Sequence, residues 1–207
     1  TLDPTRFERL ARRSGLDAAV KGVLAAKRAG FDPVKVNAVI IRGENEEDVA
    51  PLAAFAREHG LEMRFIEYMP LDAGHAWERR KVVPAEEILE TLAREIGPLA
   101  PAPDQDPRAP ALDYDYADGG GRVGLIASVS RPFCMSCNRL RLTSDGKLRN
   151  CLFALYETDV RELLRTGAPD DQVIQAVRAS VAAKWEGHEI NTARFVQPDR
   201  PMYSIGG

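Results

Sequence analysis

Hydrophobic residues recur at two different spacings along the first hundred positions. Asp3 and Pro4 suit the cap and first turn of a helix, with Phe7 and Leu10 as its apolar positions. Residues 16–29, 46–58 and 85–96 carry apolar side chains every three or four positions, which predicts three further helices. Residues 34–41 and 61–69 are short apolar runs rich in β-branched and aromatic residues, which predicts two buried strands.

Alternation of helix and strand at this spacing is typical of βα units with a parallel sheet, so we expect an α/β fold. The predicted order begins with a helix, and two parallel strands would make a poor sheet. We therefore expect the chain to be part of a longer protein.

The pattern changes in the second half. Residues 98–110 hold five prolines and are predicted to form a linker or an extended arm. A strand is expected at 123–129, a hairpin at 140–143 and 147–150 around Ser144-Asp145-Gly146, and helices near 159–166 and 170–183. The predicted domains are 1–97, a proline-rich linker at 98–111, and a second domain with antiparallel strands at 112–207.

Composition narrows the class of protein. The net charge of −3 argues against nucleic-acid binding, and no apolar run reaches the length of a membrane span. The chain holds an odd number of cysteines, three, which argues against a secreted disulfide framework and for the reducing cytosol. We therefore expect a cytoplasmic protein that binds neither membrane nor nucleic acid.

The cysteines have the spacing of metal ligands. Cys134 and Cys137 are separated by two residues, and the predicted hairpin would return Cys151 to the same place. Three unrelated buried thiols are one alternative. A structural zinc site is another, but zinc prefers four closed ligands, and only three histidines, at positions 59, 75 and 188, could supply the fourth. Three cysteines suit a [4Fe–4S] cluster with one iron left open.

Basic residues gather in the same stretch, where residues 131–149 carry five basic side chains and one acid. Arg139 and Arg141 would share one face of a strand, a pairing that suits phosphate or carboxylate. A solvated basic strand is the alternative.

In the first predicted strand, Lys35 and Asn37 share a face. In a barrel this face would line the lumen, where a lysine must be paired or bind an anion; an exposed strand end is the alternative. Glu67 and Met69 share a face at the end of the second strand, where barrel ligands bind. The final residues, Gly206 and Gly207, could enter a narrow site, although a terminal Gly-Gly is usually disordered.

Together, these segments resemble the molybdenum cofactor biosynthesis protein A family. The resemblance covers nearly the whole chain in order. Its matching pieces are LDPTRFERL (2–10), VKVNAVIIRG (34–43), RFIEYMPLD (64–72), SVSRPFCMSCNRLRLTSDGKLRNCLF (128–153) and DRPMYSIGG (199–207).

The resemblance implies specific roles for these residues. A [4Fe–4S] cluster on Cys134, Cys137 and Cys151 would bind the purine of GTP through its open iron. Arg139 and Arg141 would bind GTP, with Lys35 on the triphosphate side. Met69, and by position Asn37, would contact S-adenosyl-L-methionine, and Gly206 and Gly207 would reach into the active site.

The resemblance also implies a reaction and a missing part. The family is a group of radical S-adenosylmethionine lyases that join the 3′ carbon of GTP to C8 of its base. The family's C-x3-C-x2-C loop, which holds the cluster that splits S-adenosylmethionine, is absent here. We therefore expect the later βα units of an incomplete (βα)6 TIM-like barrel, a C-terminal α+β domain that binds cluster and GTP, an N-terminal half supplied elsewhere, and a homodimer. A zinc-bound structural or partner-docking module is the alternative.

Overall fold

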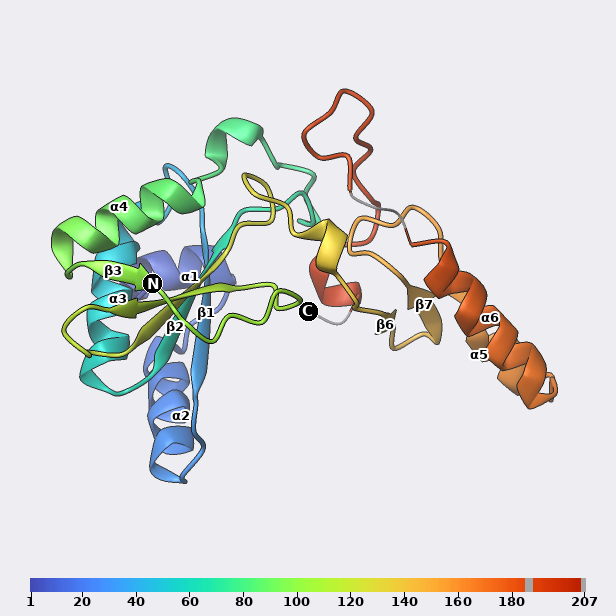
Figure 1. The fold of residues 1–207 in the computed structure, drawn as a ribbon, viewed down its shortest axis with the longest axis horizontal. Coiled ribbons are helices and arrows are strands. Elements are labelled where there is room, and N and C mark those ends of the chain that lie inside the picture. The colour runs from blue at the N-terminus through green and yellow to red at the C-terminus, as the bar shows by residue number, and fades with distance from the viewer. Residues whose placement is uncertain (185–187, 206–207) are drawn as a thin grey trace. The chain divides into compact units, whose positions relative to one another are not determined.

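The computed structural model describes residues 1–184 and 188–205. The chain forms two compact units, drawn in Figure 1. Unit 1 comprises residues 1–68 and 79–131, and unit 2 comprises residues 69–78 and 132–207. No helix in the described part of the chain is long and apolar enough to cross a membrane.

Unit 1 is built on a five-stranded mixed sheet in the order β1-β2-β5-β4-β3. The first three strands of that order are parallel, while β4 is antiparallel to β5 and β3 is antiparallel to β4. The expected α/β class and the parallel pairing of the first two strands are therefore confirmed. The strands are β1 (Lys35–Ile40), β2 (Glu62–Glu67), β3 (Leu99–Pro101), β4 (Leu112–Tyr116) and β5 (Arg122–Ile126).

The helices of unit 1 follow the predicted hydrophobic spacing. They are α1 (Pro4–Ala11), α2 (Leu16–Arg28), α3 (Val49–Glu58) and α4 (Ala85–Glu95), with 3-10 turns at Glu46–Asp48 and Arg79–Lys81. Asp3 caps α1 as expected, since its side chain accepts a hydrogen bond from the Arg6 backbone at 2.6 Å. The apolar residues of α3, α4 and β2, among them Leu52, Leu92 and Phe65, form one buried core.

The proline-rich stretch differs from its prediction. Residues 98–111 were expected to be a linker, but Leu99–Pro101 forms β3 at the edge of the sheet. An edge strand tolerates proline because the missing N–H can face away from its neighbour. The ladder continues beyond Pro101, where the backbone N–H of Ala102 donates to the carbonyl of Asp113 at 2.9 Å.

The division into units also differs from the expected boundary. The strand predicted at 123–129 was assigned to the second domain, yet β5 pairs in parallel with β2 in unit 1. Its residues Val123 and Leu125 are completely buried in the core of unit 1. Burial of this apolar face against the helices explains why the strand belongs to the larger sheet.

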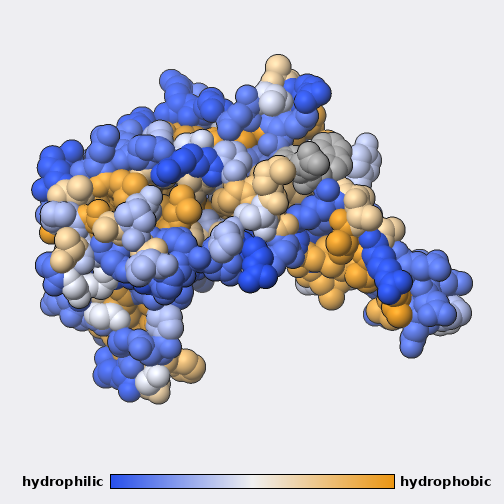
Figure 2. All heavy atoms as spheres, in the orientation of Figure 1, coloured by the Kyte–Doolittle hydropathy of each residue, from blue (hydrophilic) through white to orange (hydrophobic). Residues whose placement is uncertain are grey.

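Unit 2 contains the predicted hairpin and both predicted helices. Strands β6 (Arg141–Leu142), β7 (Lys147–Arg149) and β8 (Thr158–Asp159) form an antiparallel sheet, followed by α5 (Val160–Arg165) and α6 (Asp170–Ala182). Gly146 in the hairpin turn has φ +79°, and a Cβ there would lie 2.5 Å from Cβ of Arg161. Glycine is therefore required both for the turn and for the approach of α5. Figure 2 shows hydrophobic atoms gathered over β6, where Leu140 and Leu142 are exposed.

Glu67 is a buried carboxylate at the end of β2, only 1% exposed. Its Oε2 accepts from the backbone N–H groups of Val129 and Ser130, at 2.7 Å each. Its Oε1 accepts from the backbone of Ala85 at 2.8 Å and from the Ser130 hydroxyl. Pro84 is the N-cap residue of α4 and provides no side-chain hydrogen bond to the helix. Glu67 supplies that hydrogen bond instead, and its negative charge interacts favourably with the helix N-terminus.

We predict that Glu67→Gln destabilises unit 1. The amide nitrogen would face backbone donors in place of an acceptor, and each hydrogen bond to a charged group is worth about 1.5–3 kcal/mol. Urea unfolding should therefore show a loss of at least about 1.5–3 kcal/mol, and amide hydrogen exchange should accelerate at Val129 and Ser130. Glu90→Gln, at an exposed position of α4, is the control and should leave both unchanged. Equal stability of the two variants would contradict a structural role for the Glu67 charge.

Candidate functional site

The cysteine-containing segment of unit 2 is organised by the β6–β7 hairpin. Cys134 begins a 3-10 turn, Cys134–Ser136, and the N–H of Cys137 closes it on the Cys134 carbonyl at 3.1 Å. In the hairpin, Arg141 lies opposite Arg149. Cys151 stands two positions after β7, at the end of the hairpin away from its turn.

The thiols have different electrostatic surroundings. Burial acts to raise the pKa of Cys137, but hydrogen bonds and charge from Arg139 outweigh it, with Arg139 Nε 3.3 Å from Cys137 Sγ, and the net pKa is lowered. Burial raises the pKa of Cys151, and the charges of Cys134 and Cys137 raise it further. The ionisation of Cys151 is therefore affected by both of the other thiols.

The three cysteines are free and half-buried. Within residues 1–184 and 188–205, no three His, Cys, Asp or Glu side chains are already arranged to hold a metal ion. The three cysteines suit a metal or an iron–sulfur cluster through their chemistry, because thiolates are metal ligands. Arg139 favours the thiolate form of Cys137, and Lys184 favours that of Cys137 and Cys151. No fourth ligand for a closed zinc site joins them in the described part of the chain, where His59 packs on Phe55 and His188 on Phe153.

The arginines predicted to bind an anion lie beside these thiols. Arg139 places its guanidinium 4.8 Å from the ring centre of Phe133. Burial lowers the pKa of Arg141, the charges of Arg139 and Arg149 lower it further, and the thiols oppose this effect. Arginine stays protonated in proteins, so the lowered pKa means that the surroundings of Arg141 destabilise its charged form. A bound anion would relieve that cost.

Lys184 is a member of this site that the sequence reasoning missed. Its Nζ donates to the carbonyls of Arg139, at 2.9 Å, and of Asn150. Its charge lowers the pKa of both Cys137 and Cys151. The residue lies two positions after α6 and belongs to no motif, so the sequence offered no signal for it.

Unit 1 carries the other predicted binding residues on one face of its sheet. Lys35 and Asn37 point away from the core, and Lys35 Nζ forms an ion pair with Glu62 at 3.0 Å. Arg64, which the sequence reasoning missed, pairs with Asn37 in the register of β1 and β2, and its Nε is buried without a hydrogen-bond partner. The alternating polar positions of β2 were the signal that could have identified it.

Strands β5 and β4 continue the polar face of the sheet that carries Lys35, Asn37 and Arg64. Gly124 pairs with Arg64 on one side and with Asp113 on the other. A Cβ on Gly124 would lie 2.8 Å from Asp113 Oδ1 and 3.1 Å from Arg64 Cγ, so glycine leaves the space that these charged groups occupy. Burial raises the pKa of Asp113, while Arg64 and Lys35 lower it.

The structure therefore distributes the predicted residues over two units. Lys35 and Asn37 belong to unit 1, whereas Met69, the cysteines and the arginine pair belong to unit 2, where Met69 is half-buried. Glu67, expected to face a ligand, is instead used within unit 1 to bind backbone N–H groups. Gly206 and Gly207 lie outside the described residues.

We predict that iodoacetamide distinguishes the thiols of the reduced, iron-free chain. The rate at Cys137 should have its pH midpoint below the ordinary thiol value of about 8.5, and the rate at Cys151 should have its midpoint above it. Mass spectrometry of peptides across a pH series measures both. Arg139→Ala should raise the Cys137 midpoint and move the Cys151 midpoint much less. Equal midpoints in the unmodified sequence would contradict the proposed electrostatics.

Comparison with known proteins places the chain in a family. A family model described as Molybdenum Cofactor Synthesis C matches residues 61–190. Proteins named GTP 3′,8-cyclase from Rhodopirellula baltica and Streptomyces coelicolor are 43% and 45% identical over the whole chain, which covers 58% and 61% of their lengths. A Mycobacterium tuberculosis protein named GTP 3′,8-cyclase 2 is 47% identical, with 58% covered. The chain thus spans about three fifths of the length of these relatives, and it belongs to the Molybdenum Cofactor Synthesis C family.

Proposed function

We propose that this chain is the substrate-binding part of a GTP 3′,8-cyclase of molybdenum cofactor biosynthesis. One observation supports the proposal: Arg139 lowers the pKa of the half-buried Cys137, and the thiols of Cys137 and Cys151 act on the pKa of Arg141, so the two arginines and these thiols influence one another. The whole-length similarity to proteins named GTP 3′,8-cyclase supports it. The reaction would convert GTP to its 3′,8-cyclo-dihydroguanosine triphosphate, with radical generation supplied by a part of the longer protein outside residues 1–207.

In this proposal Cys134, Cys137 and Cys151 hold a [4Fe–4S] cluster. When bound, a cluster with three cysteine ligands supplies one iron that can coordinate a ring atom of the substrate. Lys184 would stabilise the thiolates and fix the ends of the hairpin, since its ammonium binds the carbonyls of Arg139 and Asn150. A closed zinc site, the alternative, would need a fourth ligand in addition to the three cysteines.

Arg139 and Arg141 would bind and orient GTP through charge-assisted hydrogen bonds to its oxygens. Their guanidiniums are partly withdrawn from water and close together, which favours an anion over a neutral ligand. Lys35 would contribute to the triphosphate side, while Asn37 and Met69 would contact S-adenosyl-L-methionine. The Gly206-Gly207 tail would complete the active site.

The parallel strands β1, β2 and β5 would be the later strands of an incomplete (βα)6 barrel. Three features support this assignment to a barrel. The strands run in the same direction, α3 and α4 cover the apolar face of the sheet, and the opposite face carries Lys35, Asn37 and Arg64. The homodimer, the missing N-terminal half and the cytoplasmic location stay predictions from the sequence.

The cluster is tested by metal analysis of the complete protein. Anaerobic reconstitution should give about one [4Fe–4S] cluster on the site formed by Cys134, Cys137 and Cys151. Cys151→Ala should remove that iron and sulfide while leaving any other cluster of the protein in place. One tightly held zinc per site with no sulfide would contradict the proposal.

The arginines are tested by GTP affinity in the complete protein. Arg139→Ala or Arg141→Ala should each cost about 1.5–3 kcal/mol of binding, because each removes hydrogen bonds to a charged ligand. Lysine should restore part of the affinity, since it keeps the charge but lacks the planar fork. Calorimetry measures the affinity, with Arg178→Ala on the exposed side of α6 as the control and iron content determined in parallel. Unchanged affinity in both alanine variants would exclude these arginines from GTP binding.

A further inference from the structure

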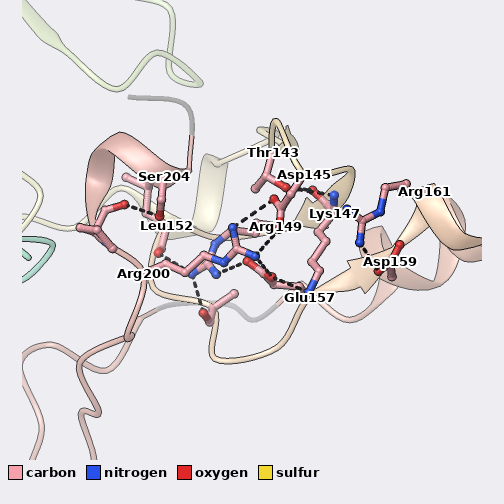
Figure 3. Close-up of polar contacts among 12 residues, drawn as sticks. Thr143, Asp145, Lys147, Arg149, Leu152, Glu157, Asp159, Arg161, Arg200 and Ser204 are labelled. Carbon is pink, nitrogen blue, oxygen red and sulfur yellow. Dashed lines mark hydrogen bonds and ion pairs between the residues drawn. The ribbon is translucent and has the colours of Figure 1, made fainter.

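The loop that follows β7 and carries Cys151 is held by a buried arginine. Arg149, only 3% exposed, is the last residue of β7 and stands two positions before Cys151. Its Nη2 donates to the Leu152 carbonyl at 3.0 Å (Figure 3) and to the Ala154 carbonyl at 2.6 Å. The side chain of Arg149 therefore binds the backbone of the loop directly after the cysteine.

A carboxylate compensates the buried charge of Arg149. Arg149 Nη1 donates to Glu157 Oε1 at 2.6 Å, and the Glu157 side chain is 13% exposed. Glu157 Oε2 lies 2.9 Å from Nη2 of Arg200, whose guanidinium also binds both oxygens of Asp145 at 3.1 and 2.7 Å (Figure 3). A buried charge is tolerated when it is paired and hydrogen-bonded. Contacts within unit 2 thus fix the guanidinium of Arg149 without help from a ligand.

The Leu152 carbonyl and the Phe153 N–H belong to one peptide bond. This bond is trans, so its oxygen and hydrogen point in opposite directions within one plane. Burial raises the pKa of Cys151, and a hydrogen bond from the backbone of Phe153 opposes that effect. Arg149 therefore binds the oxygen of a peptide bond whose N–H serves the sulfur of Cys151.

Further contacts hold the backbone on both sides of the cysteine. The N–H of Ala154 donates to the Cys151 carbonyl at 3.2 Å, which closes a turn over the two residues between them. Before the cysteine, Lys184 Nζ binds the Asn150 carbonyl. The carbonyls next to Cys151 are thus bound by two cations, Lys184 on one side and Arg149 on the other.

We propose that Arg149 is a positioning residue for the third cysteine of the candidate site. By holding the peptide bond between Leu152 and Phe153, Arg149 directs its N–H toward the Cys151 sulfur. Hydrogen bonds to ligand sulfurs help to set the reduction potential of an iron–sulfur cluster, and the partners of ligand residues affect how tightly the metal is held. This inference rests on the proposed function, in which Cys151 is a cluster ligand.

The test uses the complete protein and separates the carbonyl contacts of Arg149 from its ion pair. Arg149→Met removes both, whereas Glu157→Gln removes the charge pair and leaves the arginine donors on the carbonyls. The double variant Arg149→Met with Glu157→Gln removes both charges, so it leaves no carboxylate without its arginine. Arg161→Met is the control, because Arg161 lies in the same unit with its side chain 49% exposed and contacts Asp159 at 3.9 Å.

Three measurements are made on each variant. Amide hydrogen exchange at Ala154 in the iron-free protein reports the turn after Cys151. The rate of iron loss to a chelator reports how tightly the cluster is held, and Cys151→Ala identifies the iron that belongs to this site. The reduction potential of the same cluster, followed by electron paramagnetic resonance, reports the hydrogen bond to sulfur.

Arg149→Met should accelerate exchange at Ala154 and raise the rate of iron loss about 10- to 100-fold, the scale expected when a partner of a ligand residue is removed. The reduction potential should become more negative, because an N–H directed at sulfur stabilises the more negatively charged reduced cluster. The double variant should behave like Arg149→Met, since both lose the carbonyl contacts. Glu157→Gln should have a much smaller effect, and Arg161→Met should match the unmodified protein.

Two results would overturn the proposal. Restored iron retention and potential in the double variant would show that Arg149 serves only to pair with Glu157. An unchanged potential in Arg149→Met would show that Arg149 directs no N–H to the cysteine sulfur, even if the loop is loosened. If Cys151→Ala leaves the iron content of the protein unchanged, the proposed function fails separately, and unchanged exchange at Ala154 in iron-free Arg149→Met would then reject the hold of Arg149 on the loop.

Discussion

The buried charge of Glu67 fixes the chain where it leaves the five-stranded sheet. The chain passes between the units after residues 68, 78 and 131. Glu67 lies directly before the first passage, Ser130 directly before the third, and Ala85 begins the helix that follows the second. One carboxylate thus binds all three segments within unit 1. A buried carboxylate is costly unless it is fully hydrogen-bonded, and here backbone N–H groups and a hydroxyl provide that compensation.

In unit 2 the direction of the pKa shift separates two kinds of arginine. Hydrogen bonding to Asp145 raises the pKa of Arg200, so its charge is stabilised by partners within the chain. Burial lowers the pKa of Arg141, and the neighbouring charges of Arg139 and Arg149 lower it further. Partners at the hairpin turn therefore stabilise the charge of Arg200, whereas burial disfavours the charge of Arg141 in β6. An anion beside Arg141 would favour its charged form.

Local signals predicted the elements but not all of their pairings. Amphipathic spacing located the helices, Asp145-Gly146 located the hairpin turn, and the cysteine spacing located the candidate site. The strand at residues 99–101 was missed because the prolines in and around it suggest a linker, although an edge strand accepts Pro101. The place of β5 beside β2 depends on burial of Val123 and Leu125 against distant helices. No local pattern contains that information.

The same reasoning explains which members of the site were missed. Cys134, Cys137 and Arg139 stand within one short motif, whose spacing itself indicates the chemistry. Lys184 is a single basic residue in a segment without a pattern, and its partner Arg139 stands 45 positions away. Arg200 belongs to a segment that carried the resemblance, but its partner Asp145 stands 55 positions away, so no local pattern shows the contact. Their roles arise only when folding brings them to a carbonyl or a carboxylate. The sequence motif therefore specifies the groups that would hold a ligand, whereas the three-dimensional structure specifies the groups that hold the motif in place.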